Sequence, residues 1–453
     1  MSKQVEKTRL FSANLLSGFD PSTENIAEVI GRSNIGNRAA VLDYTSGVLR
    51  NRFAIDAILK EIAGVKENRV DKQVMNCLRV AVYEMVYKPQ TPLYAVINEA
   101  VSPFKNKHKR GFVNAVLRNI QRHIIDRDKH YSLSKSIIPT TKGRGCELKK
   151  DVAPDPAYDL AGYLNCMFSF PRWLVKDWIK SYGADEAFNI CSASNRVPSI
   201  YIRPNSTITT ASELCILFES AGVKSTVTDD GLIVIENFGK SENVHSLPGY
   251  NEGLFCVQDK TAAKVARFMA PKAGDVVVDL CAAPGTKTTH IAELLMGTGK
   301  VIATDINSKR LDLVRENASR LKLENIEIVE YDDIFKYAAG LPRINSVLID
   351  APCSNTGVLA KRLEARYRVT QQSVSQLADI GLNLLYKCAA ELKSCEQIFY
   401  STCSIDEREN AQVLHRLLKN LDCFRLKESE LTLPSDVSFG LDGGYVSELA
   451  RLR

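Results

Sequence analysis

The C-terminal part of the chain repeats one order of elements: a short apolar strand, a turn of small or acidic residues, and an amphipathic helix. Four strands of this kind occur in VVVDLCAAPGTKTTHIAELL, KVIATDINSKRLDLVRENASRL, IEIVEYDDIF and SVLIDAPCS, and a fifth, QIFYSTCS, follows a long helical stretch over residues 370–393. Buried strands that alternate with helices predict an α/β fold with a doubly wound, mostly parallel sheet. Ligands of such folds bind at the carboxyl ends of the strands, so the turns are where a function is expected.

Residues 23–130 carry a different pattern, in which apolar residues recur at helical spacing. Val41, Tyr44 and Val48 share one face of RAAVLDYTSGVLRNRF, and the helical run QVMNCLRVAVYEMVY is stopped by Pro89. No strand alternation is visible in this region. The pattern predicts an all-α N-terminal domain.

The middle of the chain mixes irregular and regular segments. From 131 to 159 the sequence SKSIIPTTKGRGCELKKDVAPDPAYD is rich in Pro, Gly, Ser, Thr and charge, which predicts a linker or a long exposed loop. FPRWLVKDWIKSYGADEAFNICSAS predicts two short helices broken at Gly183. PSIYIRPN then predicts a strand, TASELCILFESAGV a helix, and STVTDDGLIVIENF a hairpin, which together form a small α+β unit that ends near Tyr250.

These patterns divide the chain into four parts. The predicted domains are a helical domain over 1–140, a linker over 141–165, a helical plus small α+β domain over 166–250, and the doubly wound domain over 251–453.

Composition limits the class of protein without deciding it. The 453 residues carry a net charge of +6, which favours a polyanionic partner, although many soluble proteins with small ligands are equally basic. The twelve cysteines show no CxxC pair or His/Cys cluster, and neither a leader peptide nor a run of about 20 apolar residues is visible. We expect a cytoplasmic, reduced protein that is a monomer and uses neither a metal nor a membrane.

A cofactor loop is expected directly after the first strand of the sheet. Small residues there allow the backbone to approach a ligand, and the following helix offers unpaired N–H groups. The candidate loop residues are Cys281, Ala282, Ala283, Pro284, Gly285, Thr286 and Lys287. At the end of the second strand, Asp305 is placed to accept the two hydroxyls of a ribose, and after the third strand Asp332 or Asp333 is placed to reach an adenine amino group.

One acid at one strand end is most often only a helix or turn cap. Acids on successive strands of one ligand-binding edge favour a cofactor that contains a nucleoside. A P-loop nucleotide site is excluded because the GxxxxGK[ST] pattern is absent.

Two cysteines also lie at predicted strand ends. Cys353 follows Asp350 in IDAPCS, and Cys403 ends the segment FYSTC. Because parallel strands present their carboxyl ends to one crevice, both thiols are expected to meet over the cofactor. A thiolate that adds to carbon 6 of cytosine makes carbon 5 nucleophilic, a base must then remove the carbon 5 proton, and an acid near the ring nitrogen stabilises the developing charge.

Asp350 fits the role of that acid, and Lys287 is placed either to lower a thiolate pKa or to cap the cofactor loop. An arbitrary cysteine in such a sequence is most often a buried core thiol. Two of them in ligand-edge turns, one beside Asp-x-Pro, favour chemistry. Spacing alone does not decide which thiol attacks.

The segments DLCAAPGTKT, IDAPCSNTG and YSTCSIDEREN resemble the signature segments of the RsmB/Sun (Fmu) branch of RNA cytosine-5 methyltransferases, relatives of the NSUN and Nop2 enzymes. GLFCVQDKTAAKVARFM is similar to the segment that leads into their catalytic domain, and INEAVSPFKNKHKRGFVNAVLRNI to the NusB-like RNA-binding domain of this branch. The resemblance therefore covers nearly the whole chain. It implies a NusB-like helical domain, an RRM-like middle domain, and a Rossmann-like class I methyltransferase domain that uses S-adenosylmethionine.

The resemblance also implies roles for single residues. The loop from Cys281 to Lys287 binds the cofactor with Asp305, Asp332 and Asp350, Cys403 is the nucleophile, and Cys353 assists product release. The implied reaction is methylation of carbon 5 of a cytosine in small-subunit (16S) ribosomal RNA through a covalent cysteine–cytosine adduct.

The chain departs from the family pattern at three places. Thr286 stands where Gly is usual, AKRLEARYR follows Gly357 where a Pro-Asp pair is typical, and LKSCEQ replaces a Gly-rich turn before the last catalytic strand. These departures bear on substrate contacts and local geometry rather than on the reaction.

The densest basic stretch is a candidate for phosphate contacts with RNA, and the unit around 197–245 is a second candidate surface. The members of the basic stretch are Lys105, Lys107, Lys109, Arg110, Arg118 and Arg122. A tRNA substrate and a non-catalytic RNA-binding assembly factor are the alternatives. The NusB-like domain argues against the first, and the presence of both cysteines and the cofactor acids argues against the second.

Overall fold

In the computed structural model, residues 2–33, 35, 37–236 and 244–452 are described, and the chain forms two compact units. Unit 1 comprises residues 1–197 together with 359–368, and unit 2 comprises 198–358 and 369–453. The division at residue 197 falls inside the domain predicted over 166–250. The chain thus leaves unit 2 after the turn that carries Cys353 and returns ten residues later.

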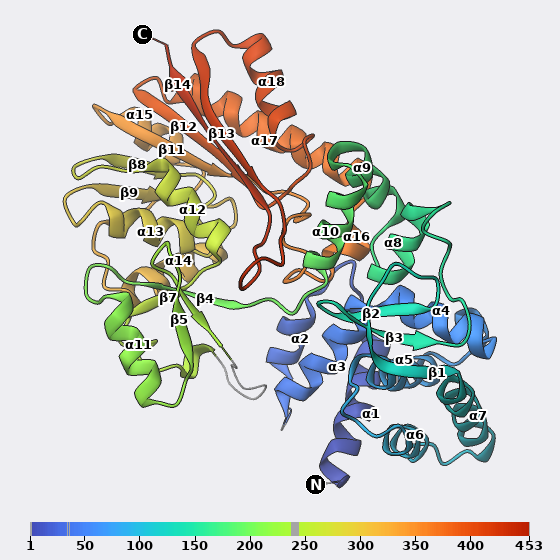
Figure 1. The fold of residues 1–453 in the computed structure, drawn as a ribbon. Coiled ribbons are helices and arrows are strands. Elements are labelled where there is room, and N and C mark those ends of the chain that lie inside the picture. The colour runs from blue at the N-terminus through green and yellow to red at the C-terminus, as the bar shows by residue number, and fades with distance from the viewer. Residues whose placement is uncertain (1, 34, 36, 237–243, 453) are drawn as a thin grey trace. The chain divides into compact units, whose positions relative to one another are not determined.

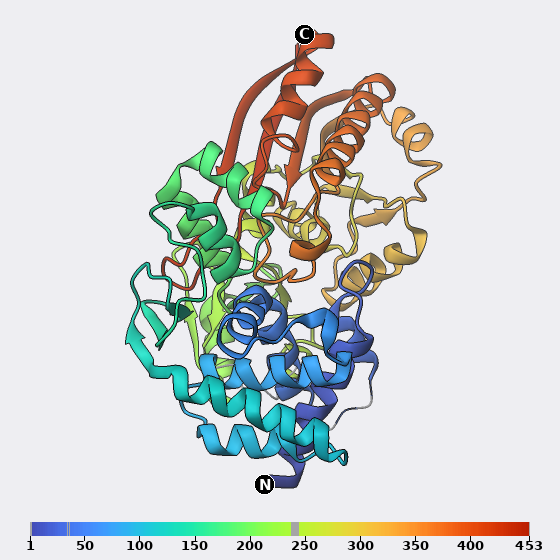
Figure 2. The same cartoon turned by 90° about the vertical axis from the view of Figure 1, so that its right-hand side faces the viewer.

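Unit 1 begins with helices (Figure 2), of which α2 to α7 lie in the range 23–130 where helices were predicted, whereas residues 124–130 of that range form a strand. They are α1 (Ser2–Gly18), α2 (Ile26–Arg32), α3 (Arg38–Arg50), α4 (Arg52–Ala63), α5 (Lys72–Tyr87), α6 (Leu93–Val101) and α7 (Lys107–His123), with a 3₁₀ turn over Glu67–Arg69. Helix α5 forms the centre of this unit, since every residue from Val74 to Val86 is buried. A helix that is buried on all sides must be covered by other helices. The amphipathic helices before and after α5 in the sequence provide this cover.

The expectation of a linker or exposed loop from 131 to 159 is wrong. Three short strands, β1 (Ile124–His130), β2 (Ile137–Thr141) and β3 (Arg144–Leu148), form an antiparallel sheet in the order β1-β3-β2. Gly143 takes a φ of +71° in the turn between β2 and β3, a conformation open to glycine. The predicted linker over 141–165 therefore contains a strand and the start of a helix, and the domain boundaries themselves stay a prediction.

Three further helices complete the continuous part of unit 1. They are α8 (Leu160–Phe168), α9 (Arg172–Tyr182) and α10 (Ala184–Ser194). The predicted break at Gly183 is confirmed, because this residue ends α9 and precedes α10 with a φ of +84°.

Residues 359–368 are anchored in unit 1 by one buried arginine at the short helix α16 (Ala365–Arg368). The Arg366 side chain is 1% exposed and donates hydrogen bonds to the backbone carbonyl oxygens of Arg50 (2.9 Å), Phe168 (3.3 Å) and Ser194 (3.3 Å). The segment that departs from the family pattern thus has a structural role in this unit.

Unit 2 begins with the predicted small α+β unit. Its elements are β4 (Ile200–Pro204), α11 (Ala211–Ser220), β5 (Ser225–Val227), β6 (Ile233–Ile235), a 3₁₀ turn over Val244–Ser246, and β7 (Phe255–Val257), with antiparallel strand order β5-β6-β4-β7. The hairpin β5–β6 is confirmed, and Gly231 has a φ of +75° in its turn. The sheet extends beyond Tyr250 to include β7, while residues 237–243 lie outside the described residues.

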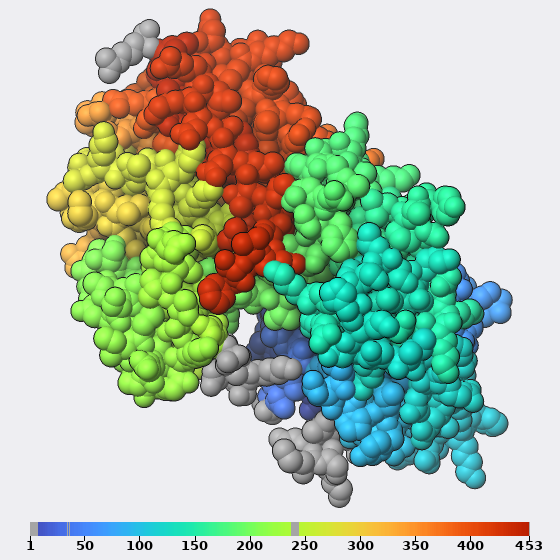
Figure 3. Space-filling model, in the orientation of Figure 1, coloured from blue at the N-terminus to red at the C-terminus, as the bar shows by residue number. Residues whose placement is uncertain are grey.

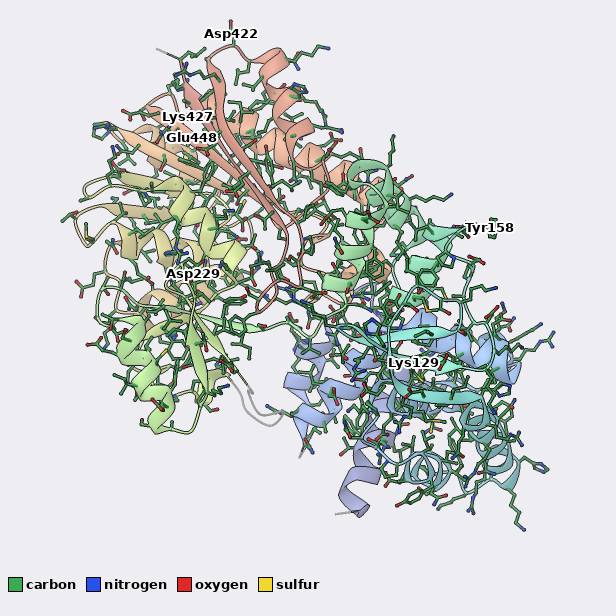
Figure 4. All side chains as sticks on the ribbon, in the orientation of Figure 1. Lys129, Tyr158, Asp229, Asp422, Lys427 and Glu448 are labelled. Carbon is green, nitrogen blue, oxygen red and sulfur yellow. The ribbon has the colours of Figure 1, made fainter. Side chains whose placement is uncertain are left out.

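The doubly wound sheet follows (Figure 1). Its strands are β8 (Val276–Asp279), β9 (Lys300–Ala303), β10 (Ile326–Ile328), β11 (Ile344–Asp350), β12 (Cys395–Thr402), β13 (Phe424–Thr432) and β14 (Gly444–Arg451), in the order β10-β9-β8-β11-β12-β14-β13. The first five strands pair in parallel, as predicted, whereas β13 and β14 add an antiparallel edge that the sequence analysis missed. Lys427 and Glu448 lie side by side across this edge pair (Figure 4).

Helices cover both faces of this sheet. One face packs against α12 (Lys260–Met269), α13 (Thr286–Leu294) and α14 (Ser308–Arg320), and the other against α15 (Ile334–Ala339), α17 (Gln371–Glu391) and α18 (Ala411–Asn420). The long helix predicted over 370–393 is therefore confirmed. Within the described ranges, no helix is both long and apolar enough to cross a bilayer.

Within unit 2, the loop between β13 and β14 of the large sheet is hydrogen-bonded to the small sheet. Ser199 donates a hydrogen bond to the backbone carbonyl of Phe439, and Tyr201 donates one of 2.8 Å to that of Gly440. In the space-filling view this red loop lies against the yellow-green residues of the small unit (Figure 3).

Candidate active site

The carboxyl ends of β8, β11 and β12 meet at one edge of the sheet because their registers align. Leu348 pairs with Asp279, and Asp350 pairs with Ser401. The turns that follow these strands therefore open into one region, as parallel pairing requires.

The loop predicted to bind the cofactor connects β8 to α13. Gly285 precedes the first residue of α13 with a φ of +102°, and a Cβ at this position would lie 3.2 Å from the Cα of Val314. Only glycine allows this close approach of loop and helix α14. The first turn of α13 thereby keeps backbone N–H groups at the ligand edge, where they suit a carboxylate or another anionic group.

Asp305 lies directly after β9 and is 4% exposed. Its carboxylate accepts hydrogen bonds from the backbone N–H groups of Ala283 (3.2 Å) and Asn307 (3.0 Å), which fix its orientation. Among the described residues, the neighbouring Thr304 hydroxyl is buried without a hydrogen-bond partner. An oriented acid beside an unsatisfied hydroxyl fits the ribose end of a nucleoside cofactor.

The two acids expected near adenine follow β10. Asp332 and Asp333 are both exposed, and Asp333 is the residue before α15. Their geometry does not choose between them.

Asp279, the last residue of β8, is a buried acid that the sequence analysis gave no role. It accepts hydrogen bonds from Thr288 Oγ1 (2.7 Å) and from the N–H of Cys281 (3.3 Å). Burial raises the pKa of its carboxyl to about 7, and repulsion from Asp350 adds to the increase. This residue holds the cofactor loop against α13.

The two predicted thiols meet. The Sγ atoms of Cys353 and Cys403 are 3.1 Å apart, and Cys403 Sγ also lies 3.3 Å from Asn355 Oδ1, which accepts its hydrogen bond. Asn355 has a φ of +61°, so the chain turns sharply after Cys353 and returns its amide towards Cys403.

Lys287 and Asp350 form an ion pair beside these thiols. Lys287 Nζ lies 2.6 Å from Asp350 Oδ2, and Ser401 Oγ donates a 2.7 Å hydrogen bond to Asp350 Oδ1. Burial alone would lower the pKa of the Lys287 ammonium. Its attraction to Asp350, and to a smaller extent its attraction to Cys403, leave that pKa above its ordinary value. Lys287 is therefore a fixed positive charge close to Cys403.

The surroundings of Cys353 oppose its ionisation. The hydrogen bond shared with Cys403 raises the pKa of the Cys353 thiol well above its ordinary value, and burial and the nearby charges of Cys403 and Glu409 raise it further. The two thiols are thus in contact but electrostatically different.

A small cavity of about 60 Å³ lies beside Cys403. Its lining includes Lys287, Thr402, Cys403 and the Gly443–Gly444 pair. Cys403 is part of the lining of this cavity, and the backbone at Gly443 is closely packed, because an added Cβ would lie 2.5 Å from the side chain of Ile405.

The basic residues predicted to contact RNA belong to unit 1. All except Lys105 lie on α7, and all are exposed except Lys109, which is half-buried and 3.7 Å from Asp71. They form a surface of the helical unit and are not part of the thiol site of unit 2.

The sequence analysis missed four polar residues that shape the site: Asp279, Asn355, Ser401 and Glu409. All four lie in or next to the motif segments, but only their contacts reveal a role. In the sequence, the only feature that pointed to these four residues was their position within a motif segment.

A doubly wound sheet with this cofactor loop, oriented acid and thiol pair defines a Rossmann-like methyltransferase. Residues 266–447 match the family model of the 16S rRNA methyltransferase RsmB/F, residues 7–122 that of the NusB family, and residues 170–238 that of the ferredoxin-like domain of RsmF/B-like methyltransferases. Over these three stretches the chain is similar to the RsmB/F methyltransferases. The predicted cofactor, S-adenosylmethionine, is that of this class of enzyme, and the loop and Asp305 fit it.

Similar proteins agree with this assignment. The probable ribosomal RNA small subunit methyltransferase B of Bacillus subtilis (strain 168) is 29% identical, over 92% of this chain and 91% of the relative. The crystal structure of PH0851 shares the fold with a TM-score of 0.72 and 22% identity, over 99% of this chain and 98% of that one. The structure of NSun6 from Pyrococcus horikoshii with SFG has a TM-score of 0.55 and 20% identity, over 63% of this chain and 99% of that one.

Proposed function

We propose that the protein transfers a methyl group from S-adenosylmethionine to carbon 5 of a cytosine in small-subunit ribosomal RNA, through a covalent bond between Cys403 and carbon 6. The observation that carries this proposal is the contact of two thiols, Cys353 and Cys403, beside the Lys287–Asp350 pair at the ligand edge of the sheet. The names of relatives such as the B. subtilis protein support ribosomal RNA as the substrate.

Cys403 is assigned the attack because a positive charge lies near it. Lys287 places a positive charge near Cys403, whose thiolate adds to carbon 6 as the ring electrons move to carbon 5. S-adenosylmethionine, when bound, supplies the electrophilic methyl group. Asp350, oriented by Lys287 and Ser401, is assigned to ring nitrogen 3: a proton taken up there from water neutralises the charge that the thiolate brings to the ring, and the resulting N–H donates a hydrogen bond to the carboxylate.

Cys353 is assigned the removal of the carbon 5 proton. Two of the causes that raise its pKa, the hydrogen bond and the charge of Cys403, disappear once Cys403 is bonded to carbon. The pKa of Cys353 then falls, so that it becomes a base only after the adduct has formed. When the proton has left carbon 5, the carbon–sulfur bond breaks and Cys403 returns as a thiolate.

Two surfaces are assigned to RNA binding. The α7 residues give phosphate contacts that provide affinity without sequence choice, and residues 197–236 and 244–245 of the small α+β unit provide a second surface. The α7 set is Lys105, Lys107, Lys109, Arg110, Arg118 and Arg122.

The test is methyl transfer from tritiated S-adenosylmethionine to purified small-subunit rRNA, followed by digestion to nucleosides. The expected product is 5-methylcytidine, with no label in the Cys403→Ala variant. Label found in tRNA but not in rRNA would favour the tRNA alternative. Failure to bind the cofactor in calorimetry would favour a non-catalytic assembly factor.

A further inference from the structure

Glu409 is a buried carboxylate behind the two cysteine turns. It is 1% exposed and lies in the loop between β12 and α18. Its Oε1 accepts a 2.8 Å hydrogen bond from the backbone N–H of Ser354, and its Oε2 accepts one of 2.5 Å from the Ser354 hydroxyl. Ser354 directly follows Cys353, so both carboxylate oxygens hold the first cysteine turn.

The residue that directly follows Cys403, Ser404, is connected to this carboxylate through Ser354. The hydroxyl of Ser404 lies 3.4 Å from that of Ser354 and 2.8 Å from Thr356 Oγ1. Ser354, Thr356 and Ser404 are all buried. The Glu409 side chain therefore holds the residue after Cys353 directly, and the residue after Cys403 through Ser354.

The backbone of Glu409 is also fixed. Tyr400, on β12, donates a 2.7 Å hydrogen bond to its carbonyl oxygen. A buried carboxylate is costly unless its hydrogen bonds are satisfied, and here Ser354 of the first cysteine turn donates to both carboxylate oxygens. A buried carboxylate is expected here if its directional hydrogen bonds fix the positions of the cysteine turns, which apolar packing would fix less well.

We propose that Glu409 is a positioning residue that ties the turn of Cys353 to the turn of Cys403 and so keeps the two thiols in contact and chemically inequivalent. This inference rests on the proposed function for its catalytic consequence, because a nucleophile and its assisting base must be held within about 0.5 Å of a productive geometry. The contacts themselves belong to the protein without substrate.

The charges around the thiols are arranged asymmetrically. Cys353 faces Glu409, Cys403 and the Tyr400 phenol, whereas Cys403 faces Lys287, which is paired to Asp350. The Glu409 carboxylate disfavours a thiolate at Cys353, whereas the charged group near Cys403 is the Lys287 ammonium. Loss of the Glu409 carboxylate should therefore bring the pH dependences of alkylation of the two thiols closer together.

The first test measures thiol alkylation by iodoacetamide as a function of pH, with protein free of RNA and cofactor and with each cysteine peptide quantified by mass spectrometry. In the wild type, Cys353 should need a higher pH than Cys403 for half-maximal alkylation. In Glu409→Gln, the midpoint of Cys353 should fall by about one pH unit, because the negative charge is gone. Glu407→Gln, the same change at an exposed side chain two residues earlier, is the matched control and should behave as wild type.

The second test measures the separation of the thiols. Phenylarsine oxide forms two arsenic–sulfur bonds with a pair of close thiols and releases one water, so binding of one equivalent across Cys353 and Cys403 reports their contact. The wild type should bind it, Cys353→Ala should not, and Glu409→Ala should bind it at least about tenfold more weakly. Glu409→Asp, which keeps the charge one methylene shorter, should recover part of the affinity.

Turnover gives the catalytic readout. Glu409→Ala should lower kcat while leaving KM for RNA near the wild-type value, with partial rescue by Glu409→Asp. Wild-type alkylation midpoints and arsenical affinity in both Glu409→Gln and Glu409→Ala would overturn the inference. Absence of methylation by the wild type would overturn the proposed function instead. The two thiol tests would still decide whether Glu409 positions the thiols, because they need neither RNA nor cofactor.

Discussion

The thiol of Cys353 and the thiol of Cys403 lie 3.1 Å apart although fifty residues separate them in the chain. Parallel pairing of β11 with β12 produces this contact, because it aligns Asp350 with Ser401 and directs both turns to one edge. Two thiols in one site allow one to bond carbon while the other manages a proton. This division of labour is the centre of the proposed mechanism.

Replacement of Cys403 should abolish methyl transfer. Cys403→Ser keeps the shape of the side chain but lacks a nucleophile of comparable strength, so turnover should fall by roughly a thousandfold or more. Filter-binding assays with labelled cofactor and rRNA measure this, and unchanged cofactor affinity in calorimetry serves as the folding control. Activity within tenfold of the wild type would contradict the assignment of Cys403.

Asp305 should control cofactor affinity. Its buried carboxylate is oriented by two backbone N–H groups, and a hydrogen bond to a charged group contributes about 1.5–3 kcal/mol. Asp305→Ala should therefore weaken binding of S-adenosylmethionine by roughly 10–100-fold. Asp312→Ala, which removes an exposed acid of the neighbouring helix α14, is the matched control. Equal affinities for the two variants would count against a ribose contact.

The basic face of α7 should make RNA binding sensitive to salt. Removing Arg110, Arg118 and Arg122 together should weaken rRNA binding at every sequence and reduce the dependence of log K on log salt by about 3. Lys393→Ala, an exposed lysine of unit 2, should change neither. Titrations at several salt concentrations measure both quantities, and an unchanged slope in the triple variant would remove α7 from the RNA surface.

Asp279 should make unit 2 less stable as the pH rises. Its folded pKa, about 7, is higher than that of an ordinary aspartate, so its contribution to stability is present below pH 4 and is lost as the pH rises through 7. Asp279→Asn should remove this dependence, and the cofactor-free variant should gain stability over the wild type between pH 5 and 8. Thermal unfolding across this range measures the difference. A constant difference between the two proteins would argue against a raised pKa.

The fold was predictable where a pattern was long and regular. Strand-turn-helix order predicts the parallel strands β8–β12, and helical spacing predicts the helices α2 to α7. The strands β1–β3 were missed because they are short, carry Pro139 and Gly145, and expose polar residues such as Lys129 (Figure 4). The edge strand β13 has an exposed, charged sequence with no strong alternation, whereas β14, which lies between β12 and β13, is buried from Gly444 to Leu449.

The site was predictable for residues whose chemistry is visible in a motif. Cys353, Cys403, Asp350 and Lys287 are brought together as expected. Glu409 was not predicted because its role depends on Ser354, fifty-five residues earlier in the chain. A contact of this kind is set by strand pairing, which the local sequence does not encode.

The most direct test of the mechanism uses small-subunit rRNA in which cytidine is replaced by 5-fluorocytidine. Fluorine at carbon 5 cannot leave as a proton would, so the adduct that forms after methyl transfer should stay bonded to the protein. Digestion and mass spectrometry should find a methylated fluoropyrimidine on the peptide that contains Cys403. An adduct on Cys353, or methylated RNA with no trapped protein, would contradict the mechanism.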